Sequence, residues 1–378
     1  GVISPWNYPF ILSMTPVLTA LFGGNAVLLK PSEHTPYSGL LAEDLAREAG
    51  LPEGLVQVII GPGTTGDALV RSGVDKVVFT GGTETGRRVM AAAAEDLTPV
   101  ILELGGKDAA IILEDADLAR AARGVAWGAF QNAGQTCISV ERVFVAEKVY
   151  DAFLRELLAQ VRIIRAGSGP GADMGPMVVP SQLEKVEAQL DDALERGAVV
   201  ALGGHRTDPA SNVFQPTVLT NVDLSSHLLR EETFGPLLPV VPVKDAEEAI
   251  RMTNDSSMGL SASVWSRDRR QGMAVARRLR VGGVSVNDVL IHYGIPGLPF
   301  GGFRESGFGR TRGLEGLGEM TRTRSLVANR VNLEREPWWF PYDRSSEVNL
   351  HAALRFRWKG GIRGLLSGAL ALVRRKRG

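Results

Sequence analysis

The chain of 378 residues contains a single cysteine, Cys137. One cysteine excludes a framework of disulfide bonds and suits a reducing compartment, so we expect a cytoplasmic protein. We assign no metal ligands. The start of the sequence lacks a methionine and a charged-then-apolar leader, so no signal peptide is visible. It opens on an apolar, strand-like stretch, and we expect that an upstream part of this domain is missing.

The residues that are present describe an ordinary soluble globular protein with two or three domains, since 44% are apolar and 22% are charged. The formal net charge of zero hides an asymmetry. From Val348 to the end there are eight Lys and Arg residues and no acids, which leaves 34 basic against 42 acidic residues, a net charge of −8, in the rest of the chain. The tail is therefore strongly basic, whereas the rest of the chain is acidic.

Strand-like and helix-like segments alternate along the chain, as in an α/β protein with a mostly parallel sheet. In a first series we expect strands at residues 26–29, 56–60, 76–79 and 100–102, and helices at 10–22, 37–48, 65–72 and 84–94. In a second series we expect strands at 142–146, 199–202, 217–219, 238–243, 261–265 and 283–287, and helices at 118–130, 150–160 and 182–196. The two series meet near residues 103–107, which places Glu103 and Cys137 close to a seam between domains, where ligand sites are common.

Cys137 follows a run of small residues, glycines and amide side chains at positions 131–136. This uncrowded setting favours a reactive nucleophile, because an inert thiol is expected to lie in a shell of aliphatic side chains. By itself it leaves both interpretations open, because free cysteines are often simply buried.

Two glycine-rich turns each join a strand to a helix. Residues 61–66 formally match G-x-G-x-x-G, but the acidic residue expected about 20 positions later is absent, so a plain turn explains them as well. The second turn, residues 79–86, carries Thr80, Gly81, Gly82 and Gly86. Its glycines let backbone amides approach a pyrophosphate at the positive end of a helix.

Three further segments offer polar groups that suit a ligand site. Lys30 and Glu33 follow a strand, and a carboxylate there can accept hydrogen bonds from ribose hydroxyls, although a helix cap is the simpler explanation. Asn7 lies in a segment made rigid by two prolines, where it can act as a donor to an oxyanion or simply form a turn. Glu232 and Phe234 precede another strand.

Together, and in this order, these motifs resemble the aldehyde dehydrogenase superfamily, and the match runs from Gly1 to about Asn329. The matching segments are Pro-Trp-Asn at 5–7, Lys30 with Glu33, Thr-Gly-Gly-Thr at 80–83, Glu-Leu-Gly-Gly-Lys at 103–107, Gly-Gln-Thr-Cys at 134–137, Glu-Glu-Thr-Phe-Gly-Pro at 231–236 and Pro-Phe-Gly-Gly at 299–302. Val-Asn-Asp at 286–288, followed by residues 298–302, looks nearest to the branch with fatty and other hydrophobic aldehyde dehydrogenases. Gly82 departs from the pattern, since many relatives carry Ser there.

The resemblance implies an α/β fold with a Rossmann-like cofactor domain, incomplete at its N-terminus, and a second α/β catalytic domain. It implies domain bounds of 1–103 for the cofactor domain, 104–300 for the catalytic domain, 301–336 for a return and oligomerisation segment, and 337–378 for the basic tail. Cys137 would be the nucleophile, Glu103 the base that activates water, and Asn7 an oxyanion donor. NAD is the implied cofactor, with NADP as the alternative. Its ligands would be Ser4, Pro5, Trp6, Lys30, Glu33, Thr80, Gly81, Gly82, Gly86, Glu232 and Phe234.

Two other functions stay open. A CoA-acylating semialdehyde dehydrogenase would also use the cysteine, but the water-activating Glu103 argues against it. A catalytically silent scaffold would keep the fold, and the retention of Asn7, Glu103 and Cys137 argues against that. The expected partners are a small hydrophobic aldehyde and further copies of the chain in a homodimer or homotetramer. Nucleic-acid binding is not expected, because the body is acidic and no further motif supports it.

The tail combines interfacial aromatics at residues 338–342 with a short apolar run at 364–373, which basic residues bracket. The run is shorter than the roughly 20 residues that a spanning helix needs. Such a segment suits a helix that lies in an anionic membrane surface, so we expect peripheral membrane contact. A disordered or subunit-docking tail is the alternative.

Overall fold

The computed structural model describes residues 1–330, 334, 336, 338–342, 347, 351 and 354. The chain divides into two compact units, Gly1–Arg322 and Thr323–Gly378, and each is described by itself. Within the described residues, no helix combines the length and the apolar character needed to cross a bilayer.

The first sheet of the unit Gly1–Arg322 has six strands in the order β15-β5-β4-β1-β2-β3. Its strands are β1 (Val2–Ile3), β2 (Val27–Lys30), β3 (Val56–Val58), β4 (Val77–Thr80), β5 (Val100–Glu103) and β15 (Gly307–Phe308). All neighbours are parallel except β15, which pairs antiparallel with β5. The last part of this unit therefore returns to the sheet that the first hundred residues build.

The helices of this first lobe are α1 (Pro9–Phe22), α2 (Pro36–Glu48), α3 (Gly63–Val70), α4 (Thr83–Glu95) and α12 (Gly313–Glu319). Pro9 and Pro36 stand in the first turns of α1 and α2, where their missing N–H has no helical partner to lose. α12 lies against the lobe, since Lys76 Nζ is 2.7 Å from Glu319 Oε2 and Asn25 Nδ2 donates to the Met320 carbonyl at 2.9 Å.

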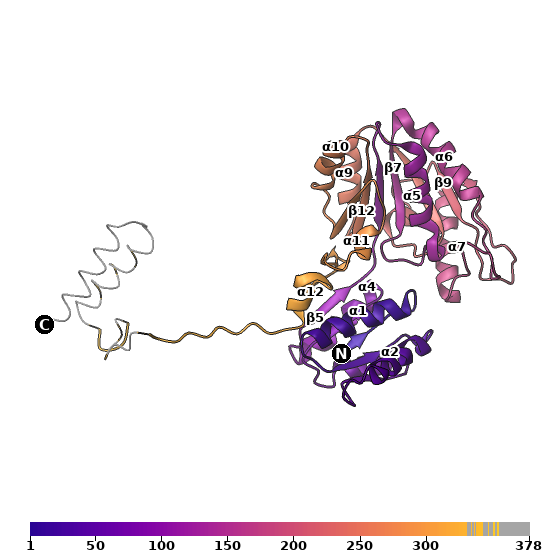
Figure 1. Cartoon of the computed structure of the whole chain (residues 1–378). Coiled ribbons are helices and arrows are strands. Elements are labelled where there is room, and N and C mark those ends of the chain that lie inside the picture. Colours follow the sequence, from indigo (N-terminus) through magenta and orange to yellow (C-terminus); the bar gives the residue numbers. More distant parts are fainter. Residues whose placement is uncertain are drawn as a thin grey trace. The chain divides into compact units, whose positions relative to one another are not determined.

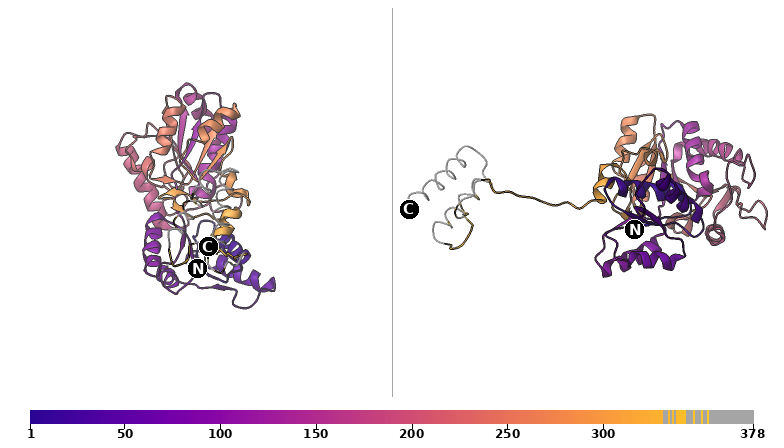
Figure 2. Two further views of the ribbon diagram at one scale, coloured as in Figure 1. Left: turned by 90° about the vertical axis from the view of Figure 1, so that its left-hand side faces the viewer. Right: turned by 60° about the horizontal axis from the view of Figure 1, so that its bottom comes forward.

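The second sheet has seven strands in the order β13-β12-β6-β7-β10-β9-β8. The strands are β6 (Asp108–Ile112), β7 (Val140–Ala146), β8 (Val199–Leu202), β9 (Thr217–Thr220), β10 (Leu237–Val243), β12 (Ser261–Trp265) and β13 (Gly283–Val286), and only β8 is antiparallel to its neighbour. The lobe also contains α5 (Leu118–Phe130), α6 (Tyr150–Arg162), α7 (Pro180–Glu195), α8 (His227–Arg230), α9 (Ala246–Asn254), α10 (Arg269–Ala276) and α11 (Ile291–Gly294). The two lobes are seen one above the other in Figure 1 and in the left view of Figure 2.

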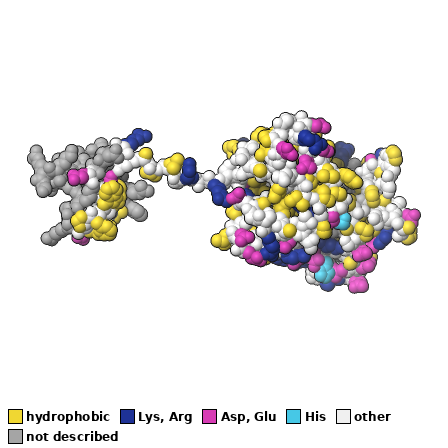
Figure 3. All heavy atoms as spheres, turned by 90° about the horizontal axis from the view of Figure 1, so that it is seen from below, with side chains coloured by type: hydrophobic (Ala, Val, Ile, Leu, Met, Phe, Trp, Pro, Cys, Tyr) yellow, Lys and Arg dark blue, Asp and Glu magenta, His cyan; other side chains and the backbone are white. Residues whose placement is uncertain are grey.

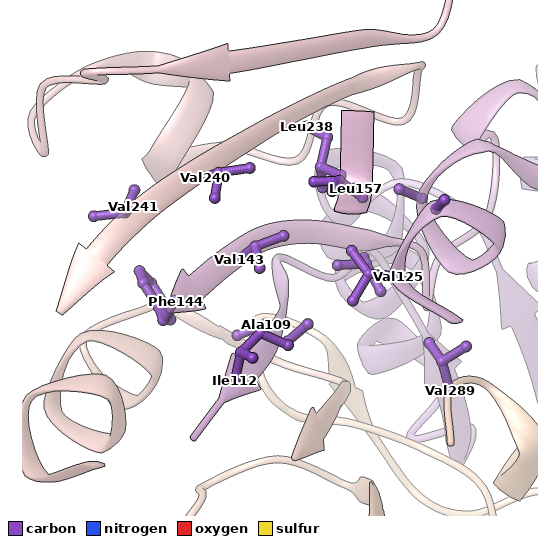
Figure 4. Packing of buried hydrophobic residues seen from close by; sticks show 14 of the residues in the cluster. Ala109, Ile112, Val125, Val143, Phe144, Leu157, Leu238, Val240, Val241 and Val289 are labelled. Atoms are coloured by element: carbon purple, nitrogen blue, oxygen red, sulfur yellow. The ribbon is translucent and has the colours of Figure 1, made fainter. Parts of the chain in front are cut away.

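The largest hydrophobic core lies around this second sheet. Val143 and Phe144 on β7 lie beside Val240 and Val241 of β10, and Leu157 of helix α6 belongs to the same core, as Figure 4 shows. All seven residues of β7 are buried, as expected for a parallel strand that is covered on both faces. This rigid strand begins three residues after Cys137, so the core fixes the segment that carries the thiol.

The expected elements are present with ends that differ by at most two residues, and the predicted α/β class is confirmed. Three longer elements, β6, α9 and α10, were not predicted, nor were the shorter α8, α11, α12 and β15. β6 directly follows the glycine-containing run 104–107, so its five residues were not recognised as a separate strand. It is nevertheless an interior strand of the second sheet, between β12 and β7.

Apolar side chains are also exposed on the first lobe. Phe22 at the end of α1 is 80% exposed, and Leu18 and Leu41 are partly exposed on α1 and α2. Figure 3 shows hydrophobic side chains gathered across the face of the molecule seen from below. In the unit Thr323–Gly378, Trp338, Trp339, Phe340 and Tyr342 are exposed.

Candidate active site

The carboxyl ends of four neighbouring strands of the first sheet carry most of the expected cofactor residues. Glu103 ends β5, Thr80 ends β4, residues 4–7 follow β1, and Lys30 ends β2. Because these strands are parallel and adjacent in the order β5-β4-β1-β2, their ends meet at one edge of the sheet. Ligands of open α/β sheets bind at this edge.

The thiol of Cys137 follows a strained loop. Asn132, Ala133 and Gly134 all have positive φ values, of 51°, 57° and 71°. Any side chain at Gly134 would start 2.3 Å from the Gly235 carbonyl, so only glycine fits there. Strained non-glycine residues persist only where the surrounding structure holds them, and they cluster at functional sites.

Asn7 ties the first lobe to this loop. Its Nδ2 donates to the Gln135 carbonyl at 3.0 Å, and its own carbonyl accepts from Asn132 Nδ2 at 3.0 Å. The next residue, Tyr8, is hydrogen-bonded to Thr136 at 2.9 Å. Asn7 Nδ2 carries two hydrogens, so one remains for a ligand beside the thiol.

The surroundings of Cys137 keep its thiol protonated. Burial raises the pKa of Cys137 well above its usual value, and the carboxylates of Glu103, Glu232 and Asp108 raise it further. A hydrogen bond with the Ile138 backbone acts in the opposite direction. Among the described residues, the Cys137 N–H donates no hydrogen bond, so it too is available to an oxyanion.

Glu103 is buried at the end of β5, with 6% of its surface exposed. Burial raises its pKa to about 7, while a hydrogen bond from the Thr311 hydroxyl and the charges of Arg312 and Arg310 limit the rise. A carboxyl group with this pKa exchanges protons near neutral pH, which suits a general base.

Two cavities meet at Cys137. The first, of about 170 Å³, brings together ten of the predicted site residues, namely Pro5, Trp6, Asn7, Thr80, Gly81, Gly82, Glu103, Cys137, Glu232 and Phe234. The second, of about 370 Å³, is lined mostly by apolar side chains. It includes Leu12, Val289 and Leu290, which are buried, and Ile11, Trp127 and Ile291, which are about half exposed. The thiol therefore faces a polar and an apolar compartment at once.

The other predicted cofactor residues do not line the polar cavity. Ser4 is buried and its hydroxyl bonds that of Ser13 at 2.6 Å. Lys30 Nζ lies 3.1 Å from Glu33 Oε2, at the end of β2 farther along the same edge. Gly86 lies inside α4, where any side chain would start 2.6 Å from Leu104 Cδ2. Glycine at this position therefore serves the packing of α4 against Leu104.

Sequence reasoning missed several residues that belong to the site. Thr311 contacts Glu103, Trp127 and Asp288 line the apolar cavity, and Glu141 bonds the turn that carries Glu232. Only Glu141 had a sequence signal, as an acidic residue near the start of an apolar strand, where a charge needs a buried partner. Trp127 lies in the predicted helix 118–130 and Asp288 in the Val-Asn-Asp motif, but neither pattern indicates a cavity, and Thr311 lies in a segment without a local pattern.

Comparison with known proteins places the whole core of the chain in one family. A family model described as the aldehyde dehydrogenase family matches residues 1–326. A 4,4'-diapolycopene aldehyde oxidase of Methylomonas sp is 48% identical over 356 residues, which cover 94% of this chain and 67% of the relative. A putative succinate-semialdehyde dehydrogenase [NADP(+)] of Mycolicibacterium smegmatis is 39% identical, over 88% of this chain and 65% of the relative.

Solved structures agree with these relatives. An NAD-dependent aldehyde dehydrogenase from Sinorhizobium meliloti superposes with a TM-score of 0.86 at 37% identity, covering 90% of this chain and 68% of that one. A Mycobacterium tuberculosis aldehyde dehydrogenase complexed with NAD+ gives a TM-score of 0.84 at 36% identity, covering 88% and 69%. The chain thus spans about two thirds of the length of the relatives it matches. On this combination of family match, identity and shared fold, the chain belongs to the aldehyde dehydrogenase family.

Proposed function

We propose that the protein oxidises an apolar aldehyde to the carboxylic acid with reduction of NAD or NADP. The observation that carries this proposal is the position of Cys137 between an apolar cavity and a cavity lined by Asn7, Glu103 and the 80–82 turn. An aldehyde can approach the sulfur from the first side, while polar groups act on the reacting carbon from the second.

The geometry supports covalent catalysis by Cys137. The thiol gives its proton to solvent water and becomes a thiolate, whose sulfur bonds the aldehyde carbon while the C=O π pair moves to oxygen. The new oxyanion can accept hydrogen bonds from the free N–H of Asn7 Nδ2 and from the Cys137 backbone N–H. When bound, a nicotinamide cofactor supplies the hydride acceptor that turns this thiohemiacetal into a thioester.

Glu103 is the proposed base for the second half of the reaction. It removes a proton from water as the water oxygen bonds the thioester carbon. The C–S bond then breaks, the acid leaves, and a proton returns to the sulfur. The pKa of about 7 lets the Glu103 carboxyl group hold and release this proton near neutral pH.

The residues of the polar cavity fit a dinucleotide. No heavy atom lies within 4 Å of the position that a Cβ would take at Gly82, which precedes the first residue of α4, so a phosphate has room at the positive end of a 13-residue helix. Gly81 and Gly82 would hold the pyrophosphate, Lys30 and Glu33 the adenosine ribose, and Glu232 with Phe234 the nicotinamide ribose.

The lining of the larger cavity supports an uncharged, apolar aldehyde. None of its described lining residues is Lys, Arg or His, and its one charged residue, Asp288, forms no ion pair among the described residues. A carboxylate on the substrate would meet this like charge without a cation to balance it, which costs affinity. The name of the Mycolicibacterium relative points to such an anionic aldehyde, whereas the cavity supports a neutral one.

The proposal is tested by following NADH formation with the full-length protein and matched pairs of aldehydes, such as octanal and 8-oxooctanoate. We expect kcat/KM to be at least about tenfold higher for the neutral partner. Cys137→Ala should abolish turnover and leave NAD binding intact, and undiminished turnover in this variant would refute the mechanism. The CoA-acylating alternative is separated by adding CoA, which should neither raise the rate nor replace the free acid as product.

The assembly state and the location stay predictions. We infer a homodimer or homotetramer from the family resemblance, and a cytoplasmic protein from the single cysteine.

A further inference from the structure

Lys107 and Glu141 form an ion pair in the interior of the second lobe. Lys107 Nζ is 2.6 Å from Glu141 Oε2, and the two side chains are 0% and 4% exposed. Burying two charges carries a large desolvation penalty, so such a pair is weak evidence for stability. Neither residue has a role in the chemistry proposed above. The remaining hydrogen bonds of the pair show which segment of the chain it holds in place.

Both residues bond the same short turn, at Thr233 and Phe234. The Glu141 carboxylate accepts from the Thr233 N–H at 2.8 Å and from the Phe234 N–H at 2.8 Å. Lys107 Nζ donates to Thr233 Oγ1 at 3.0 Å, and that hydroxyl donates onward to Gln189 Oε1 at 2.8 Å. Phe234 has a φ of 52°, which is a strained backbone conformation for a residue other than glycine. The hydrogen bonds to Glu141 can stabilise this conformation.

This turn presents two side chains to the polar cavity. Glu232 Oε1 accepts from the Gly106 N–H at 3.1 Å, next to Lys107 in the chain. The ring of Phe234 meets that of Trp6 edge to face, with centroids 5.4 Å apart. Both Glu232 and Phe234 line the cavity that also contains Cys137.

The pair also lies where the turn meets the thiol loop. Glu141 is four residues after Cys137 in the buried strand β7, and the carbonyl of Gly235 fills the place of a side chain at Gly134. The turn and the thiol loop thus line the cavity from two sides, and the loop is held by its own hydrogen bonds with Asn7.

We propose that the Lys107–Glu141 pair is a positioning device that fixes the 233–234 turn, so that Glu232 and Phe234 meet the nicotinamide ribose of the cofactor. This inference rests on the proposed function. Lys107 and Glu141 act through the turn and touch neither the cofactor nor the substrate. Cofactor affinity should depend on them, while the reactivity of the thiol without cofactor should not.

Glu141→Gln tests the inference. The amide keeps one acceptor oxygen but puts an N–H₂ where a carboxylate oxygen bonded the turn and Lys107. We expect the dissociation constant of NAD, measured by calorimetry on the full chain, to rise at least tenfold. The rate at which iodoacetamide alkylates Cys137 without cofactor should change less than twofold. Leu157→Ala is the control, because Leu157 is fully buried in α6 and lines neither of the two cavities at Cys137. It should lower thermal stability and leave NAD affinity unchanged.

A second variant covers the case in which Glu141→Gln does not fold. Lys107→Met combined with Glu141→Gln removes both charges, so no unpaired buried charge remains. This double variant should fold and still bind NAD at least tenfold more weakly. NAD affinity equal to that of the unaltered chain in the double variant would overturn the inference alone. Failure of the unaltered chain to bind NAD would overturn the proposed function as well.

Discussion

The hydroxyl of Thr311 donates a hydrogen bond to Oε1 of Glu103, although 208 positions of sequence separate the two residues. Thr311 is held in place by its backbone, which exchanges two hydrogen bonds with Phe300, at 2.7 and 2.8 Å. The bond favours the charged form of Glu103 and thereby counters the effect of burial, which raises its pKa to about 7.

The first prediction is a pH dependence with a known sign. Only the carboxylate form of Glu103 accepts a proton from water, so thioester hydrolysis should quicken as pH rises through about 7 and then level off. Thr311→Val removes the hydrogen bond to the carboxylate, so the pKa of Glu103 should rise. The rising limb of the plot of kcat against pH, called the limb below, should then move to higher pH. Thr311→Ser keeps the hydroxyl and should leave the limb in place. An unmoved limb in the valine variant would contradict this role of Thr311.

The second prediction separates the two half-reactions. Glu103→Gln should allow acylation of Cys137 and slow hydrolysis, because an amide does not accept a proton from water. Rapid-quench kinetics should show a burst of NADH followed by turnover at least about a hundredfold slower than in the unaltered enzyme. Loss of the burst would instead assign Glu103 to deprotonation of the thiol, whose pKa is raised by burial.

The third prediction concerns cofactor choice. Glu33 is half exposed beside Lys30, and hydrogen bonds from the backbone and from Lys30 outweigh burial, so the pKa of Glu33 stays below its usual value. The resulting carboxylate would repel the 2′-phosphate of NADP, and we expect a preference for NAD. Glu33→Gln should reduce the ratio of kcat/KM for NAD over NADP about tenfold, whereas Glu53→Gln, at an exposed position, should not. A higher kcat/KM for NADP than for NAD in the unaltered enzyme would refute the assignment.

The fourth prediction concerns the tail, most of which lies outside the described residues. Its exposed aromatics, Trp338, Trp339, Phe340 and Tyr342, and the eight basic residues after Val348 suit an anionic membrane surface. The full chain should co-sediment with anionic vesicles more than a chain that ends at Glu336, and salt should weaken the difference. Equal partitioning of the two chains at moderate salt would remove the membrane hypothesis and favour a subunit-docking or free tail.

The sequence could predict those features that depend on residues close together in the chain. The ordered motifs from Asn7 to Phe300 identified the family, and the comparisons confirm it. The period of apolar residues placed α5 at Leu118–Phe130 with the correct ends, and the glycines at 81 and 82 marked the turn before α4. Each of these signals lies within a few residues of the feature it predicts.

The tertiary structure alone decided which distant residues meet. Thr311 reaches Glu103, Lys107 pairs with Glu141, and Asp288 joins the apolar cavity only because strands and loops from separate parts of the chain are brought together. The energy of such contacts depends on burial and on the hydrogen-bond partners that the fold supplies. No periodicity or motif encodes these partners, and the same residue types on a solvated surface would have ordinary pKa values and little effect on binding.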